Sequence, residues 1–443
     1  MYRLLFIFGI WFVQTNILFA QMPERKAMLG LRIHTVDGAQ QVDSIVAGST
    51  AAKAGIQKQD LITQFNGLPV PQTEDFLRRA SEVRSRETVH FTVKRKGKLL
   101  ELSTSAIARP YLELSGADVR YGWLSAVGCN IRKIVYVPKG QSRTPGIFFV
   151  PGYNCGSIEN YPDNFNGKMI EAWVKAGFTV YTLEKSGLGD SYGCKPCVEV
   201  DLQNDIELFE QGLKDFMALK EIDPNHIFIW GHSMGGIIAP LIAQHTPVKG
   251  IMVFGTVFRP WSEFLPEMHR VQKPLLDSIS LADAEIFVRN MHQIYDEFFL
   301  QKKSPEELHR NPKYKSLVES ELEYMPGKTS MWGRHWRFWQ QLDSIDLAAA
   351  WENIDAQVLV MHGASDFIQC SALEPYLIHE AVNHAHPGNA TLKIIPDIDH
   401  LMMKSKDFKE AARNMNEKAY LNGNFNPALA EETVRWMNSR MLK

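Results

Sequence analysis

The sequence lacks the features of a nucleic-acid-binding or membrane-spanning protein. Its 443 residues include 48 Lys and Arg against 50 Asp and Glu, and no basic block is longer than residues 94–96. Because phosphate binding needs a concentrated basic face, no nucleic-acid partner is expected. No stretch after Ala20 is apolar enough to cross a bilayer, so no membrane span is expected in the mature chain. Internal repeats are also missing, and the length predicts two or three globular domains.

Cysteine is scarce, which limits metal and redox chemistry. The five cysteines are Cys129, Cys155, Cys194, Cys197 and Cys370. Cys194 and Cys197 have C-x-x-C spacing, but no second C-x-x-C and no nearby His pair accompanies them, so a zinc site is not indicated. The context of a thioredoxin-like redox motif is missing too. We therefore interpret the cysteines as structural, with at least one free thiol because the count is odd, and expect no metal or cofactor.

Residues 1–20 have the pattern of a signal peptide. Arg3 supplies a positive charge, residues 4–13 form an apolar run, and Leu18-Phe19-Ala20 is a plausible cleavage site that ends in a small residue. The alternative is an uncleaved anchor, but residues 14–16 interrupt the apolar run well short of the roughly 20 residues that a bilayer span needs. No Cys follows the cleavage site, so a lipid anchor is not indicated. We expect residues 1–20 to be removed and the mature protein to be exported, either periplasmic or secreted.

Residues 22–107 have the pattern of a small β-rich module. Residues 46–56 (VAGSTAAKAGI) and 59–67 (QDLITQFNG) precede a helix near residues 73–83 and strands at residues 89–94 and 99–103. These segments resemble the PDZ domains of bacterial exported proteases. The resemblance implies that Leu29, Gly30 and Leu31 form a loop that binds a peptide C-terminus, while the next strand accepts the peptide as an added strand. A packing module that binds nothing is the alternative.

From residue 113 to residue 443, strands alternate with helices. An opening antiparallel pair at residues 119–126 and 131–138 precedes six apolar runs, at residues 146–150, 178–183, 227–231, 250–255, 357–361 and 391–395. This order predicts an α/β fold with a mostly parallel sheet and helices on both faces. Residues 257–345 interrupt the order with a long, aromatic-rich, mostly helical passage that has no convincing strand. This passage predicts a helical cap over the site.

Two G-x-S-x-G segments compete for the role of nucleophile, at residues 189–193 and 231–235. A nucleophile elbow must leave a strand and enter a helix at once. Ser233 directly follows the apolar residues 227–230 and precedes a helix beginning near residue 237, whereas Ser191 lies in a loop. We predict Ser233 as the nucleophile and Ser191 as a loop residue that shapes the site.

A serine nucleophile needs a base to take its proton and a carboxylate to hold that base. Asp366 follows the apolar run at residues 357–361, and His400 follows the run at residues 391–395. We predict that Ser233, Asp366 and His400 form a catalytic triad, because both partners follow strand ends in the expected order. The rival candidates are Asp397, Asp399, His232 and His362.

These segments together resemble the α/β-hydrolase superfamily from residue 113 to the end of the sequence. The likeness is strongest to a bacterial exported group with "EKxGxGDSxGxxC" and "GHSMGG" segments, which stand here at residues 184–197 and 231–236, with GTVFRPW at residues 255–261. The resemblance implies the α/β-hydrolase fold and hydrolysis through an acyl-enzyme, without supplying a substrate.

The developing oxyanion needs backbone donors near the nucleophile. One is the N–H of Met234, the residue after the nucleophile. The second is expected from residues 151–155, where Pro-Gly replaces the family's usual His-Gly and Tyr153 holds the donor position.

Cys155 lies in this loop, and the loop with Cys194 and Cys197 follows the next strand. Both loops should emerge at one sheet edge, so we predict a disulfide from Cys155 to one of that pair.

The leading prediction is a serine hydrolase of carboxylic esters or related small acyl substrates. A serine peptidase, to which the PDZ-like module presents peptide C-termini, is an alternative. A non-catalytic PDZ adaptor with an inactive hydrolase fold is another. Four cap tryptophans line an acyl pocket or belong to a plain core: Trp261, Trp332, Trp336 and Trp339.

Overall fold

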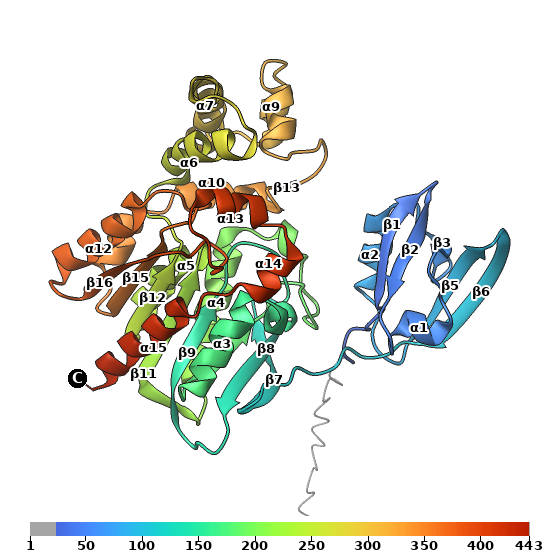
Figure 1. Ribbon diagram of the computed structural model, residues 1–443, viewed down its shortest axis with the longest axis horizontal. Coiled ribbons are helices and arrows are strands. Elements are labelled where there is room, and N and C mark those ends of the chain that lie inside the picture. The colour runs from blue at the N-terminus through green and yellow to red at the C-terminus, as the bar shows by residue number, and fades with distance from the viewer. Residues whose placement is uncertain (1–23, 443) are drawn as a thin grey trace, which may run out of the picture. The chain divides into compact units, whose positions relative to one another are not determined.

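The computed structural model describes residues 24–442, and the signal peptide expected at residues 1–20 lies outside them. The chain divides into two compact units, one ending at Tyr111 and the other beginning at Leu112. Figure 1 shows the first unit in blue and the second in colours from teal to red.

The first unit is a small antiparallel sheet with two helices. Its strands pair in the order β1-β2-β3-β5-β6, and β4 pairs with β3. Phe65, Phe76 and Phe91 pack together at its centre. Helix α1 begins after Ser49, whose side chain accepts the Ala52 N–H, and it ends at a left-handed glycine. The elements are β1 (Leu31–Val36), β2 (Ala39–Ile45), α1 (Thr50–Ala54), β3 (Leu61–Phe65), β4 (Leu68–Pro69), α2 (Thr73–Ala80), β5 (Thr88–Arg95) and β6 (Lys98–Ser105).

The second unit is built on an eight-stranded sheet in the order β16-β15-β12-β11-β9-β10-β8-β7. Strands β7 and β8 are antiparallel, β8 is antiparallel to β10, and the other neighbours are parallel. The α/β-hydrolase fold expected from the sequence is confirmed. The strands are β7 (Ala117–Ala126), β8 (Cys129–Pro138), β9 (Thr144–Val150), β10 (Thr179–Leu183), β11 (Ile222–His232), β12 (Gly250–Phe254), β15 (Gln357–Gly363) and β16 (Ala390–Ile395).

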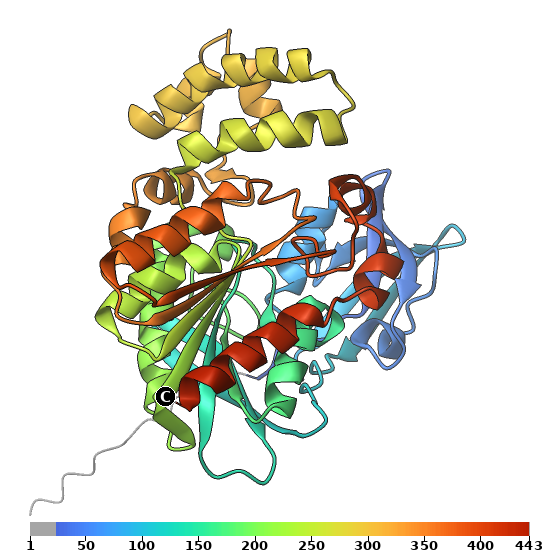
Figure 2. The ribbon, with the colours of Figure 1, turned by 60° about the vertical axis from the view of Figure 1, so that its left-hand side comes forward.

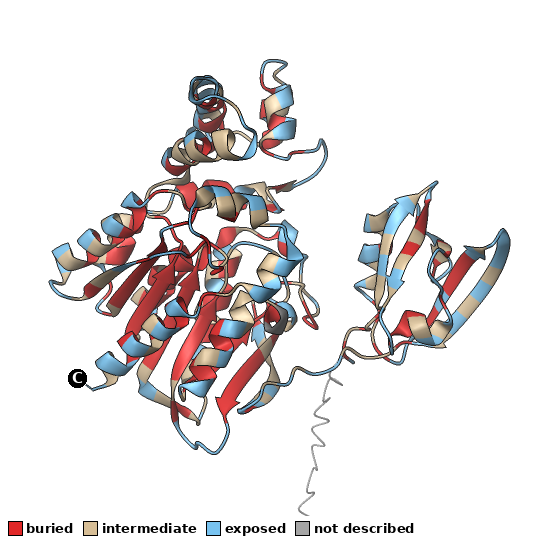
Figure 3. Cartoon of the chain, viewed as in Figure 1, coloured by how far each residue is buried: buried red, intermediate tan, exposed pale blue. Residues whose placement is uncertain are grey.

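Helices cover both faces of this sheet, so its central strands are buried almost throughout (Figure 3). One core joins the sheet to α4 (Leu202–Met217), α5 (Gly235–His245), α11 (Leu347–Glu352) and α12 (Leu373–Ala385). The other core joins it to α3 (Phe165–Lys175) and α15 (Ala428–Met441). Alternate residues of one strand serve the two cores, as Phe148 and Phe149 of β9 do. The remaining helices outside the cap are η1 (Ile158–Asp163), η2 (Cys197–Glu199), α13 (Phe408–Asn414) and α14 (Lys418–Gly423).

A mostly helical passage lies between β12 and β15 in the sequence, and its yellow helices stand beyond one end of the sheet (Figure 2). It contains α6 (Trp261–Leu276), α7 (Leu281–Tyr295), η3 (Asp296–Leu300), α8 (Pro305–His309), α9 (Lys315–Ser320) and α10 (Trp336–Asp343). It also contains a two-stranded hairpin that the sequence did not predict, β13 (Ser330–Met331) and β14 (Arg334–His335). Each strand is too short to show a period-2 pattern. The structure shows a tight hairpin turn between them, in which Trp332 and Gly333 both have the positive φ that such a turn requires.

No helix within residues 24–442 is both long and apolar enough to cross a membrane.

Candidate active site

Ser233 occupies a sharp turn between β11 and α5. Its φ is +54°, in the left-handed region that strains a residue with a side chain. Two glycines allow the turn. A Cβ on Gly231 would lie 2.6 Å from the Gly235 oxygen, and a Cβ on Gly235 would lie 2.0 Å from the Val150 oxygen. The strand therefore passes into the helix with Ser233 at the junction, and the N-terminal end of α5 adds partial positive charge there.

Asp366 and His400 meet at the ends of neighbouring strands. His400 Nδ1 lies 2.8 Å from Asp366 Oδ2, and both side chains are buried. The other Asp366 oxygen accepts the N–H groups of Ile368 and Gln369 at 3.0 and 2.8 Å. A carboxylate beside Nδ1 favours the tautomer that carries its proton there, which leaves Nε2 able to accept one. Burial opposes charge on His400, but the attraction of Asp366 outweighs it and raises the pKa of His400 above its usual value.

His232 supports His400 from the backbone side. Its Nε2 lies 2.9 Å from the His400 carbonyl oxygen, and the two rings lie 4.9 Å apart between centroids. Because a carbonyl oxygen only accepts, Nε2 of His232 must carry the proton. Burial lowers the pKa of His232 to about 3, so this ring stays neutral. His232 therefore holds the backbone at His400 through this contact.

Gly255 is a site residue that the sequence reasoning missed. It follows β12, and its φ is +62°. A Cβ at this position would lie 2.9 Å from His400 Nδ1 and 3.0 Å from Asp366 Oδ2. Only glycine leaves the room that this hydrogen-bonded pair occupies. A glycine at a strand end was visible in the sequence, but the pair that needs the space was not.

The loop after β9 passes beside Ser233. A Cβ on Gly152 would lie 3.5 Å from Ser233 Cβ and 3.9 Å from Ser233 Oγ. The next residue, Tyr153, lines the same cavity as Ser233 and Met234. Within residues 24–442, the backbone N–H groups of Tyr153 and Met234 donate to no protein acceptor. Two unused N–H groups near a serine are what an oxyanion hole requires.

A cavity of about 620 Å³ opens at Ser233 and His400. Its wall is mostly apolar and comes largely from the helical passage that begins at α6. Of the four cap tryptophans, Trp261, Trp332 and Trp339 line the cavity and Trp336 does not. Trp261 and Trp339 stack with centroids 5.7 Å apart. The cavity can therefore hold a bulky apolar group next to the serine.

The second unit contains two disulfides, and one of them holds the loop beside Ser233. Cys155 pairs with Cys197, which confirms the predicted link from Cys155 to the C-x-x-C pair. Cys129 pairs with Cys194, and Cys370 is the remaining thiol. Burial raises the pKa of the Cys370 thiol to about 12, so this sulfur is a poor nucleophile at neutral pH.

The rival residues lie in structural contacts. Ser191 is buried, and its Oγ accepts the backbone N–H of Arg132 at 3.0 Å. Asp399 accepts the Met403 N–H and the Tyr420 hydroxyl, each at 2.8 Å. Neither residue lines the cavity of Ser233.

The predicted peptide-binding loop of the first unit precedes an edge strand. β1 is the last strand on its side of the sheet, so one of its edges has no partner strand among the described residues. The carbonyls of Leu29 and Gly30 accept the N–H groups of Ala51 and Val46, which ties the loop to the start of α1 and to the residue after β2. Phe76 of α2 is 2% exposed and belongs to the core of the unit.

No group of His, Cys, Asp and Glu side chains within residues 24–442 is arranged to hold a metal ion.

Comparisons with known proteins match both units. A model of the family described as serine aminopeptidase, S33, matches residues 163–407, which is more than half of the chain. A model of the PDZ domain matches residues 27–105. Among curated proteins, esterase EstD of Thermotoga maritima is 20% identical over 306 residues, covering 68% of this chain. The chain spans 64% of the length of that relative.

Solved structures of esterases are also similar. Est1E from Butyrivibrio proteoclasticus with bound ferulic acid has a TM-score of 0.45 and 14% identity, over 73% of this chain and 100% of that one. A carboxyl esterase from Bacillus coagulans in complex with glycerol has a TM-score of 0.44 and 14% identity, over 73% of this chain and 99% of that one.

Proposed function

This chain belongs to the serine aminopeptidase S33 family of hydrolases, and from that premise we propose that it is an exported serine hydrolase of carboxylic esters. The single observation that carries the proposal is the arrangement at one cavity. Ser233 stands there on a strained turn, and His400 lines the same cavity with its ring held by Asp366.

The proposed reaction follows from the protonation states at the site. Neutral His400 takes the proton of the Ser233 hydroxyl through Nε2 while Oγ attacks the substrate carbonyl. Asp366 stabilises the imidazolium that forms, and the N–H groups of Met234 and Tyr153 stabilise the oxyanion. His400 then returns the proton to the leaving alcohol, which leaves an acyl group on Ser233. Water, deprotonated by His400, attacks the acyl group in the same way and releases the acid.

The substrate is proposed to be an ester with an apolar acyl group. Support comes from the apolar cavity wall and from the curated relative, which is an esterase. A peptidase is the second candidate, because the family description names an aminopeptidase. The two differ in the leaving group, since a peptidase must expel an amine instead of an alcohol.

Labelling with a fluorophosphonate probe tests the nucleophile. The wild-type protein should be labelled, the Ser233→Ala variant should not, and the Ser191→Ala control should be labelled as well as wild type. Loss of labelling at Ser191 with retention at Ser233 would overturn the assignment, and an unlabelled wild type would favour an inactive adaptor. Turnover of p-nitrophenyl esters is then compared with turnover of aminoacyl p-nitroanilides. Faster anilide cleavage would replace the ester proposal with the peptidase.

The first unit is a PDZ domain, and its ligand is proposed to be a peptide C-terminus. Support comes from the unpaired edge of β1 and from the loop of Leu29, Gly30 and Leu31 directly before it. In a titration, the full chain should bind a peptide with a free C-terminal carboxylate more tightly than the same peptide with an amidated C-terminus. Equal binding of the two peptides would rule out this loop as the carboxylate site.

Export of the protein is supported by its two disulfides, which persist in oxidising compartments. Sequencing of the mature N-terminus tests this part of the proposal. The mature chain should begin at Gln21, and a mature chain that still begins at Met1 would contradict cleavage.

A further inference from the structure

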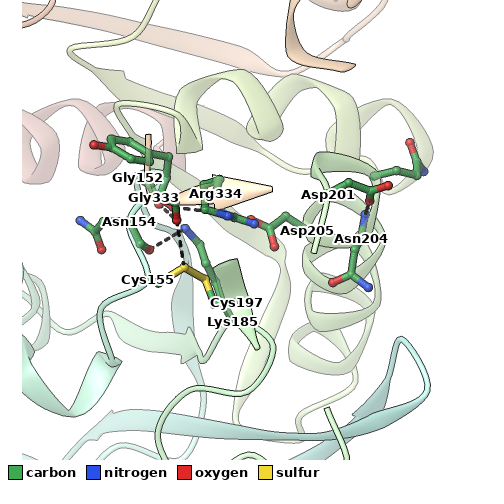
Figure 4. A network of polar contacts seen from close by, with 12 residues as sticks. Gly152, Asn154, Cys155, Lys185, Cys197, Asp201, Asn204, Asp205, Gly333 and Arg334 are labelled. Carbon is green, nitrogen blue, oxygen red and sulfur yellow. Dashed lines mark hydrogen bonds and ion pairs between the residues drawn. A yellow bond between two sulfur atoms is a disulfide. The ribbon is translucent and has the colours of Figure 1, made fainter. Parts of the chain in front are cut away.

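Two buried cations bind three consecutive carbonyls of the loop beside Ser233 (Figure 4). Lys185 Nζ donates to the carbonyl oxygen of Gly152 and, at 3.0 Å, to that of Asn154. Arg334 Nη1 donates to the Tyr153 carbonyl oxygen between them at 2.9 Å. Lys185 follows β10, while Arg334 comes from the hairpin in the cap. Both side chains are almost completely buried, at 3% and 0% exposure.

The contact with Gly152 has a direct consequence for Tyr153. The carbonyl of Gly152 and the N–H of Tyr153 belong to the same peptide group, and no peptide bond of the described chain is cis. In a trans peptide the C=O and N–H bonds point in opposite directions. An ammonium that holds the Gly152 oxygen therefore turns the Tyr153 N–H away from Lys185, to the other side of a loop that runs beside Ser233.

We propose that Lys185 is a positioning residue of the oxyanion hole: it fixes the peptide between Gly152 and Tyr153 so that the Tyr153 N–H faces the developing oxyanion. The proposal rests on the proposed hydrolase function. Lys185 does not line the cavity of Ser233, and it acts through this peptide group. A positive charge at the carbonyl end also polarises the group, which makes the N–H at the other end a stronger donor.

The charges around Lys185 distinguish this role from plain packing. Asp205 pairs with Arg334 at 2.8 Å, whereas Lys185 has no carboxylate within ion-pair distance among the described residues. Of these two buried cations, only Arg334 is therefore paired with a carboxylate. Burial lowers the pKa of Lys185 to about 7, and Asp205 and Arg334 act on it in opposite directions. A lone buried charge costs stability. If position 185 served only the stability of the fold, an apolar side chain would stabilise it better than this lysine does.

The test compares Lys185→Met with a matched control, Lys133→Met. Lys133 is also largely buried, at 14% side-chain exposure, but it pairs with Asp215 at 2.5 Å and does not line the cavity of Ser233. Both variants are made in the full chain. The measurements are kcat and KM for a p-nitrophenyl ester, the inhibition constant of an alkyl trifluoromethyl ketone, and the melting temperature. The ketone is chosen because its adduct with a serine carries an oxyanion.

For Lys185→Met, kcat should fall roughly 100-fold, as when one oxyanion donor is lost. The ketone should bind more weakly by a similar factor, KM should change less than about threefold, and the melting temperature should hold or rise. For Lys133→Met, the melting temperature should fall while kcat stays near wild type. The Lys185→Gln variant keeps an N–H donor group without the charge and should have an intermediate kcat.

An unchanged kcat in folded Lys185→Met would overturn the proposal. So would a kcat loss accompanied by a fall in melting temperature with unchanged ketone binding. If neither Lys185 variant folds, Lys185 serves stability first and the proposal also fails. A wild-type protein without turnover and without probe labelling would instead refute the hydrolase function.

Discussion

Replacement of Gly255 by alanine tests the geometry of the His400–Asp366 pair most directly. The added methyl group would lie 2.9 Å from His400 Nδ1 and 3.0 Å from Asp366 Oδ2. Ordinary contact begins near 3.4 Å, so the imidazole must retreat by several tenths of an ångström or the backbone must shift. Asp366 cannot follow freely, because its other oxygen is held by two backbone N–H groups.

The expected loss has two separable parts. A left-handed backbone, here at φ +62°, costs an alanine about 1–2 kcal/mol of stability. The steric intrusion adds about 1–3 kcal/mol if the pair stays in place. If the ring moves instead, the loss appears in catalysis. A displacement of this size should lower kcat/KM by roughly 10- to 100-fold.

The matched control is Gly388→Ala. Gly388 has φ +86°, and a Cβ there would meet nothing within 4 Å, so it carries the backbone penalty without the intrusion. Thermal melting and ester turnover are measured for both variants. Gly388→Ala should lose stability and keep its kcat/KM, whereas Gly255→Ala should lose both. Gly255→Ala with stability and turnover equal to the control would refute the argument that this glycine makes room for the pair.

Three further predictions concern the same site. Asp366→Asn removes the charge that raises the pKa of His400. The ascending limb of the plot of kcat/KM against pH, which reports neutral His400, should therefore move to lower pH, and kcat should fall roughly 10⁴-fold. A limb that does not move would assign this titration to another group. Replacing Cys155 and Cys197 by serine opens a link with a sequence separation of 42, which should cost about 4 kcal/mol in denaturant melts and also lower kcat, because the loop beside Ser233 loosens. Removal of the other disulfide, with a separation of 65, should cost similar stability and leave kcat unchanged, and equal kcat losses would contradict this. Trp261→Ala should raise KM roughly 10-fold for a long-chain ester and little for an acetate, and a uniform change would place the acyl group elsewhere.

The sequence by itself determined the features that depend on local pattern. The apolar runs at residues 227–230 and 357–361 predict buried parallel strands, because a strand covered by helices on both faces of its sheet is apolar on both sides. The Gly-x-Ser-x-Gly turn at Ser233 is also local, since its glycines relieve crowding within a few residues. Asp366 and His400 could be chosen because both follow strand ends, and parallel strands bring such ends together. Their catalytic roles stay predictions.

Only the tertiary structure decided the contacts between segments that are distant in the chain. The Arg334 guanidinium reaches the Tyr153 carbonyl across 181 residues, from a hairpin too short to leave a pattern. In the sequence, Lys185 was only the second residue of the EKxGxGDSxGxxC segment. The folded loop shows which carbonyls its ammonium binds. The choice of Cys197 over Cys194 as the partner of Cys155 likewise depended on where two loops emerge from the sheet. Such contacts are set by positions in space, and a single sequence carries no local periodicity that encodes them.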